Sequence, residues 1–156
     1  MKHEILSLLA RARKNTLVRV GTSATMAEIR QCLIIIHQRW PRSYCDFLLQ
    51  VGSLDLAGDL ILGLGKGISD EHSVFARTFH ARAVSGLELP AKYAVVYEVG
   101  NGDLECLDCG KVKDGECPVV LWMHDHPDAS LQKPEIIAKT FTSWLAKKIE
   151  NAPDIG

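Results

Sequence analysis

The sequence predicts an α+β domain in which helices pack on a central antiparallel sheet. Helical patterns occupy most of residues 1–84 and the last part of the chain, whereas short strands cluster in residues 93–123. Separate runs of helices and strands are typical of this class. With 47% hydrophobic and 24% charged side chains among 156 residues, the composition suits a globular protein. We expect residues 1–156 to form a single domain.

Three short strands joined by two tight turns are predicted in residues 93–123. The side chains of residues 93–99 alternate between two faces, which is the period of a half-buried strand. Asn101-Gly102 and Asp114-Gly115 are dipeptides that favour two-residue hairpin turns. The apolar run over residues 118–123 supplies the third strand.

Amphipathic patterns predict the first two helices. Residues 1–13 place apolar side chains at helical spacing, and residues 15–23 form a connector with strand-like pieces. Thr25 and Glu28 make a capping box, so a second helix begins there and ends before Pro41. Its buried stripe is expected to comprise Ile29, Cys32, Leu33, Ile34, Ile35 and Ile36.

Pro41 can start a third helix, for which Gly52 is the expected C-terminal cap. Its inward-facing residues are Tyr44, Phe47, Leu48 and Val51. Residues 59–64 are short, apolar and flanked by glycines, which favours a strand.

Two further helices complete the prediction. Ser69 or Asp70 caps a helix that runs to about Val84, with Val74, Phe75 and Phe79 facing inward. After a polar loop over residues 124–134, a closing helix is expected to contain Ile137, Phe141, Trp144 and Leu145.

Total charge and cysteine content exclude several classes of protein. A net charge of -1 and a pI near 6.6 give no overall attraction to nucleic acid or to an anionic membrane. No run approaches the ~20 apolar residues that span a bilayer, and charged residues interrupt the region where a signal peptide would need an apolar core. With five cysteines, an odd number, we expect a cytoplasmic protein with reduced thiols.

Charge is distributed unevenly along the chain. Residues 1–50 carry eight Lys or Arg against three acids, whereas residues 98–128 carry eight acids against two lysines. This pattern fits internal ion pairing, and it also fits an acidic face for a basic partner.

Three motifs have the residue types of a ligand site. Cys106, Cys109 and Cys117 provide one pair and one lone thiol, whereas zinc ribbons present two pairs, so structural cysteines are expected. His124-Asp125-His126 has a spacing that metals use but lacks a defined third ligand, which favours an exposed loop. The glycines of residues 63–67 fit neither the dinucleotide fingerprint nor the P-loop, so we expect a turn. No catalytic residue, metal or cofactor is predicted.

Several short motifs follow one another in a characteristic order. They are Glu28-Ile29, Trp40–Leu48, Leu89-Pro90, Cys106–Asp108, Lys113–Val120 with Trp122, and Thr140–Leu145. Over about residues 24–148 the chain resembles the SUKH superfamily, which includes Knr-type regulators and bacterial immunity proteins, and is most similar to its YobK-like antitoxin branch. Trp40–Leu48 matches the family's Leu-Pro-x-x-Tyr-x-x-Phe-Leu signature, with Trp40 in place of Leu. The family's Asn-Gly-Gly after this helix is Val51-Gly52-Ser53 here.

The resemblance implies a function as well as the SUKH fold, with residues 1–23 as an N-terminal helix and connector. The implied function is that of a non-enzymatic immunity protein, which binds and neutralises a cognate secreted toxin, often a nuclease, in the cytoplasm. A monomer or weak homodimer without nucleic-acid or membrane partners is expected. Because acidic groups can mimic nucleic-acid phosphates, the expected partner contacts are Asp70, Glu71, Asp103, Glu105, Asp114 and Glu116.

Two other functions stay open. The same fold can act as a cytosolic regulatory or scaffold module that binds proteins, which a gene neighbourhood without a toxin would favour. A small metal-dependent enzyme would use the three cysteines and the histidines, and it would require stoichiometric zinc.

Overall fold

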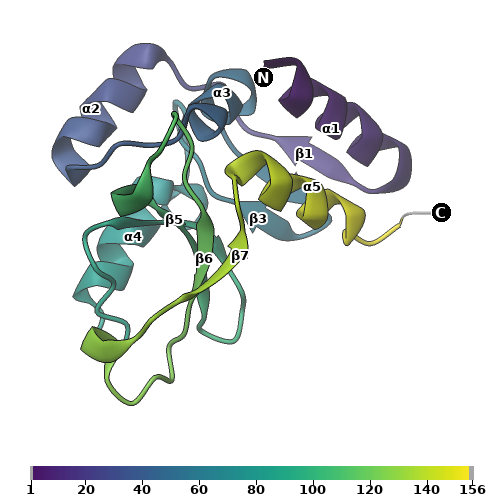
Figure 1. Cartoon of the computed structure of the whole chain (residues 1–156). Coiled ribbons are helices and arrows are strands. Elements are labelled where there is room, and N and C mark those ends of the chain that lie inside the picture. Colours follow the sequence, from purple (N-terminus) through teal and green to yellow (C-terminus); the bar gives the residue numbers. More distant parts are fainter. Residues whose placement is uncertain (1, 155–156) are drawn as a thin grey trace.

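A computed structural model describes residues 2–154 as an α+β protein (Figure 1). Within these residues the helices are α1 (Lys2–Asn15), α2 (Met26–Ile36), α3 (Arg42–Val51), α4 (Val74–Ala83) and α5 (Phe141–Glu150). The strands are β1 (Val18–Val20), β2 (Leu54–Leu56), β3 (Asp59–Ile61), β4 (Tyr93–Glu98), β5 (Leu104–Asp108), β6 (Val119–Trp122) and β7 (Glu135–Ala138). Short 3-10 turns are η1 (Asp70–His72), η2 (Cys109–Lys111) and η3 (Ala129–Leu131).

The described strands form two antiparallel sheets, where the sequence had predicted one. The smaller sheet has the order β1-β2-β3, and the larger is the meander β4-β5-β6-β7. Strand β3 lies within the strand predicted over residues 59–64, and β1 lies within the connector predicted to have strand-like pieces. Strand β2 was missed because its three residues are too few to show alternation, so the second sheet was not recognised. The predicted closing helix is also shorter, because Ile137 lies in β7 and Thr140 caps α5.

Strand β4 is buried on both faces, although half-burial had been predicted. Residues 93–96 are each 3% exposed or less. The outer edge of β4 is also covered, because the Val95 N–H donates to Thr78 Oγ1 at 3.0 Å and the Leu62 N–H donates to the Val96 carbonyl at 2.9 Å. Covering an edge strand in this way removes a surface that could pair with another chain.

The two predicted turns differ in outcome. Asp114 and Gly115 have φ angles of 55° and 79°, and Lys113 and Glu116 exchange backbone hydrogen bonds across them, so the two-residue turn is confirmed. Between β4 and β5 the positive φ angles fall on Gly100 and Gly102 and not on Asn101, and the connection is longer than two residues.

Two helices present faces other than those predicted. The capping box of α2 is confirmed, but Ile34 and Ile35 are 72% and 49% exposed, because α2 is only buried along Ile29, Cys32 and Ile36. Helix α4 begins at Val74 after a Ser73 cap, since Asp70–His72 forms the separate turn η1. The buried face of α4 follows Val74, Thr78 and Ala81 at i, i+4 and i+7, so Phe79 lies off this face and is 37% exposed.

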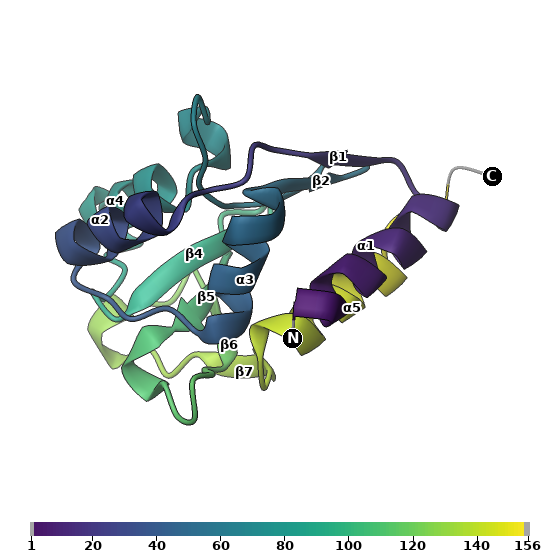
Figure 2. The ribbon, with the colours of Figure 1, turned by 90° about the horizontal axis from the view of Figure 1, so that it is seen from above.

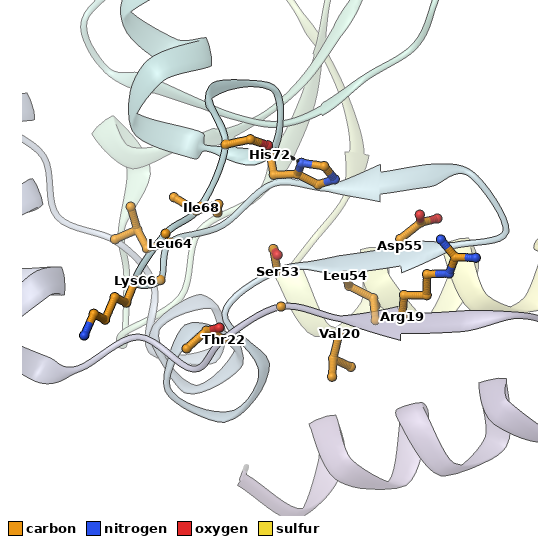
Figure 3. Close-up of a pocket in the computed structure, with 14 residues that line it drawn as sticks. Arg19, Val20, Thr22, Ser53, Leu54, Asp55, Leu64, Lys66, Ile68 and His72 are labelled. Carbon is orange, nitrogen blue, oxygen red and sulfur yellow. Dashed lines mark hydrogen bonds between the residues drawn. The ribbon is translucent and has the colours of Figure 1, made fainter.

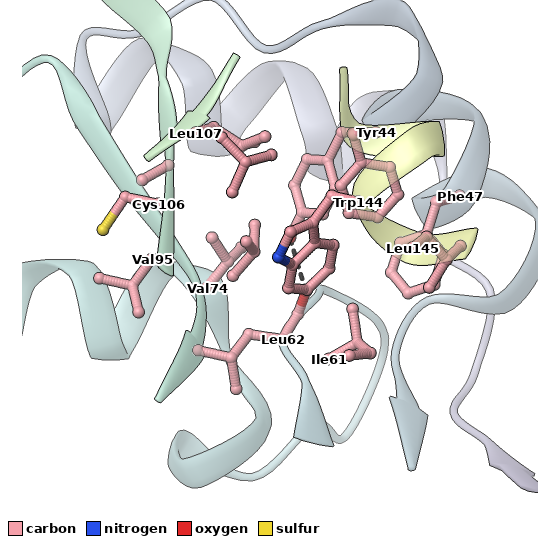
Figure 4. Packing of buried hydrophobic residues seen from close by; sticks show 14 of the residues in the cluster. Tyr44, Phe47, Ile61, Leu62, Val74, Val95, Cys106, Leu107, Trp144 and Leu145 are labelled. Carbon is pink, nitrogen blue, oxygen red and sulfur yellow. Dashed lines mark hydrogen bonds between the residues drawn. The ribbon is translucent and has the colours of Figure 1, made fainter. Parts of the chain in front are cut away.

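The core is centred on aromatic residues of α3 and α5 (Figure 4). The rings of Tyr44 and Phe141 meet edge to face at 4.9 Å, and Phe141 also packs against Phe47 at 5.3 Å. The buried Tyr44 hydroxyl donates to the Leu62 carbonyl at 2.6 Å, which ties α3 to the end of β3. Helix α1 lies along α5 and contacts α3, as the view from above shows (Figure 2).

Candidate functional site

The six acidic residues predicted to contact a partner do not share one surface. Asp103 lies in the β4–β5 turn, and Asp114 lies in the β5–β6 turn. In a meander these turns fall at opposite ends of the sheet, separated by the five residues of β5, or roughly 17 Å. Figure 1 shows the β5–β6 tip beside α3 and the other turn at the far end of β4 and β5.

Glu116 supports the start of α3. Its two carboxylate oxygens accept from the Ser43 N–H at 3.1 Å and from the Ser43 hydroxyl at 2.8 Å. Pro41, at the N-cap, makes no side-chain cap hydrogen bond, so Glu116 serves as the cap from a distant part of the chain. Asp114, two residues away, is exposed.

Glu105 is also held by internal contacts. Its carboxylate accepts from Trp144 Nε1 at 2.7 Å and pairs with Lys148 Nζ at 3.1 Å, both on α5. The Lys148 ammonium lies 3.6 Å from the centre of the Tyr97 ring as well. Glu105 therefore fastens β5 to α5, and its role in partner binding stays a prediction, as does that of Glu116.

Most acidic side chains of residues 98–128 either make internal contacts or lie at one end of the larger sheet. Glu98 pairs with Arg77 at 2.9 Å, and Asp108, 2% exposed, accepts from the Gly110 N–H at 3.2 Å. Asp103, Asp125 and Asp128 lie on the β4–β5 and β6–β7 connections, which meet at the same end of the sheet. We call these three residues the acidic sheet end.

Asp103 organises the acidic sheet end. Its Oδ1 atom accepts from the His124 N–H at 3.0 Å and lies 2.6 Å from His124 Nδ1. These two bonds, the backbone bond first, lower the pKa of the Asp103 carboxyl. Ligand atoms of Asp103, His124 and Asp125 lie within 4.8 Å of one another, a grouping that could hold a cation.

The sequence had offered no third ligand beside the histidine motif, because Asp103 is distant in the chain. The signal lies in the strand register. Leu104 pairs with Trp122, so the residue before β5 must lie near the residues that follow β6. If the pairing register of β5 and β6 had been predicted, it would have placed Asp103 beside His124.

The cysteines pack as apolar groups. Burial raises the pKa of the Cys32 thiol to about 12, and burial followed by the charges of Asp46 and Glu116 raises that of Cys45 to about 11. Cys106 is completely buried, and the pKa of the half-buried Cys109 thiol is raised by a hydrogen bond with Cys117 and by burial. The raised pKa values keep these thiols protonated at neutral pH, whereas a nucleophilic cysteine reacts as its thiolate.

Asp70 and Glu71 are exposed on η1, beside a polar cavity of about 380 Å³ (Figure 3). We call this cavity the glycine-loop pocket. It opens where β1 and the start of β2 face the loop that precedes η1, and it is lined by residues 19–22, 53–55, 64–69 and His72. The sequence had indicated the glycine turn but not its neighbours on β1 and β2, because β2 was not predicted.

The protein therefore has an α+β fold, polar sites at its surface and a hydrophobic core centred on aromatic residues. A model of the SUKH superfamily, SUKH_5, described as SMI1-KNR4 cell-wall, matches residues 2–150. The chain therefore belongs to this family, and the predicted resemblance is confirmed. Within residues 2–154, no helix has both the length and the apolar character that a membrane crossing requires.

Proposed function

We propose that the protein is a non-enzymatic immunity protein, which binds a cognate toxin, of nuclease type, in the cytoplasm and blocks it. The observation that carries this proposal is the family match over residues 2–150. The SUKH resemblance implies protein partners of this kind, and the regulatory or scaffold module is the alternative that the same match allows.

The proposed contacts lie foremost at three acidic positions of the surface, while Glu105 and Glu116 stay in the proposed set as carboxylates that also make internal contacts. The three positions are the acidic sheet end around Asp103, the tip at Asp114, and η1 with Asp70 and Glu71. The acidic sheet end is favoured, since it gathers three carboxylates on adjoining connections. A basic substrate groove of a nuclease would be attracted to such a surface, and the attraction would increase the association rate at low salt.

Charge reversal at exposed positions tests these contacts without unfolding the protein. Asp125→Lys places a positive charge beside Asp103 and leaves its bonds to His124 intact. We expect this variant to weaken the toxin complex about tenfold or more at low salt, with a smaller loss at high salt. Asp114→Lys and the double variant Asp70→Lys, Glu71→Lys test the other two positions. Affinity is measured by surface plasmon resonance with the product of the adjacent open reading frame.

Glu4→Lys on the exposed side of α1 makes the same charge change elsewhere and should bind as the wild type does. If all three reversals left the affinity unchanged, the acidic contacts would be wrong. The immunity function itself is tested separately, by survival of cells that co-express the toxin. No protection and no complex with the neighbouring product would favour the regulatory module.

A further inference from the structure

We propose that the glycine-loop pocket binds the phosphate group of a small phosphate monoester. Its volume of about 380 Å³ lies in the range of small-molecule sites. The pocket is lined by two cations, a histidine, several hydroxyls and a glycine-rich segment of backbone (Figure 3). This combination of donors matches a group with three terminal anionic oxygens.

The glycine loop supplies backbone donors. The N–H groups of Gly65, Lys66 and Gly67 make no hydrogen bond to another residue of the described chain. Gly65 and Gly67 have φ angles of 154° and 76°, and a Cβ at residue 65 would lie 2.2 Å from the Thr22 carbonyl oxygen. Glycine is therefore required at Gly65 for both conformation and space. Because no acceptor within residues 2–154 takes these N–H groups, they are available to a ligand oxygen.

Ser53 supplies a hydroxyl that faces the pocket. The residue is only 6% exposed, yet its Oγ atom makes no hydrogen bond within residues 2–154. Figure 3 shows the hydroxyl directed into the space between β2 and the glycine loop. A Cβ at Gly21 would lie 2.3 Å from this oxygen, so the absence of a side chain there leaves it room. Ser53 Oγ is not among the buried, unpartnered side-chain atoms of residues 2–154, so this oxygen is open to the cavity. A ligand oxygen can replace water there as its hydrogen-bond partner.

The charged side chains that line the cavity have a net positive charge, although the carboxylates of Asp70 and Glu71 lie beside it on η1. Arg19 and Lys66 line the cavity, and the one lining carboxylate is Asp55, which pairs in register with Arg19 across β1 and β2. His72 Nδ1 lies 2.6 Å from Ser69 Oγ, which orients the ring and leaves Nε2 without a partner among the described residues. An arginine fork and a lysine point charge are the side chains that recognise phosphate.

The ligand is expected to be a monoester and not a nucleoside triphosphate with magnesium. In a P-loop the lysine is followed by Ser or Thr, whose hydroxyl binds the metal. Here Gly67 and Ile68 follow Lys66, so that ligand is missing. The phosphate can belong to a free metabolite or to a phosphorylated serine of another protein, and both present the same dianion.

Titrations of the full-length protein with two probes test the proposal. The probes are glycerol 3-phosphate and the capped peptide acetyl-Gly-phosphoserine-Gly-amide, followed by amide NMR shifts and calorimetry. We expect saturable shifts at Gly65, Lys66 and Gly67 with at least one probe. Tighter binding of glycerol 3-phosphate would support a metabolite, and tighter binding of the peptide would support a phosphorylated partner.

Lys66→Gln and Ser53→Ala should each weaken binding about tenfold. Lys139→Gln removes an exposed charge elsewhere and should bind as the wild type does. The proposal is overturned if neither probe shifts the loop amides up to 10 mM (roughly the weakest affinity of interest). It is also overturned if Lys139→Gln weakens binding as much as Lys66→Gln does.

Discussion

Asp103 links two connections of the larger sheet through its bonds to the backbone and ring of His124. These bonds lower its pKa in the folded state, below the value of about 3.9 for an unfolded chain. The carboxylate therefore contributes stability that is fully present above pH ~3.9 and is lost as the pH falls through the folded pKa. We expect Asp103→Asn to be less stable than the wild type at pH 6, and this difference to shrink by pH 3, in urea unfolding.

Asp114→Asn is a suitable control for this comparison. Asp114 is exposed in the other turn, and asparagine tolerates its φ angle of 55°. A difference between wild type and Asp103→Asn that stayed constant from pH 6 to pH 3 would contradict the assigned role of the carboxylate.

At the scale of single residues, sequence reasoning identified acids but could not assign their partners. Glu105 is bound by Trp144, which is 39 residues away, and Glu116 is bound by Ser43, which is 73 residues away. Such contacts arise only when strands and helices pack, so an acid that supports the fold looks the same in the sequence as one that is free. The cysteines were assigned correctly to packing, because free cysteine is commonly buried.

Helix α3 depends on the β5–β6 turn for its first hydrogen bonds. The Arg42 N–H donates to the Gly115 carbonyl at 2.7 Å, and Ser43 donates to Glu116 through both its backbone and its hydroxyl. We expect Glu116→Ala to reduce the free energy of unfolding by about 1–3 kcal/mol, since part-buried donors lose their acceptor. Urea unfolding measures this change, and a Glu116→Ala protein as stable as the wild type would contradict it.

At the scale of elements, long amphipathic patterns were predictable and short strands were not. The capping box at Thr25 and the stripe of α3 follow from local sequence, and both are confirmed. Strands β2 and β7 have only three and four residues, too few to show a strand pattern of their own. Their conformation depends on pairing with neighbouring strands, β2 with β3 at Ile61 and β7 with β6 at Val119. Packing also decided which face of α2 is buried, so Ile34 and Ile35 were misassigned.

At the scale of the molecule, α1 is part of the core and not an appendage. Leu9 is 4% exposed where α1 meets α3 and α5, whereas Leu6, on the same helix, is 52% exposed. We expect Leu9→Ala to destabilise the protein by about 2–5 kcal/mol through the cavity it leaves. Leu6→Ala is the matched control and should change stability by less than about 0.5 kcal/mol in the same unfolding experiment.

The opposed charges of residues 1–50 and 98–128 can be interpreted only in the whole molecule. Two acids of residues 98–128 pair with cations, Glu98 with Arg77 and Glu105 with Lys148, and both cations lie outside the basic segment 1–50. Asp103, Asp125 and Asp128 gather at one end of the larger sheet, whereas the exposed Asp114 lies at the other end. The sequence therefore indicated an acidic surplus, and the topology determines where it lies.

The support of α3 by Glu116 also affects how the chain folds as it is made. The first turn of α3 leaves the ribosome 73 residues before its cap, which at about 5–20 residues per second is a delay of about 4–15 s. Over that interval the Ser43 N–H and hydroxyl can donate only to water. They reach Glu116 only when a contact of long sequence separation forms. Pulsed hydrogen exchange during refolding should show the Ser43 amide protected together with the β5–β6 turn, and protection before that turn forms would contradict this order.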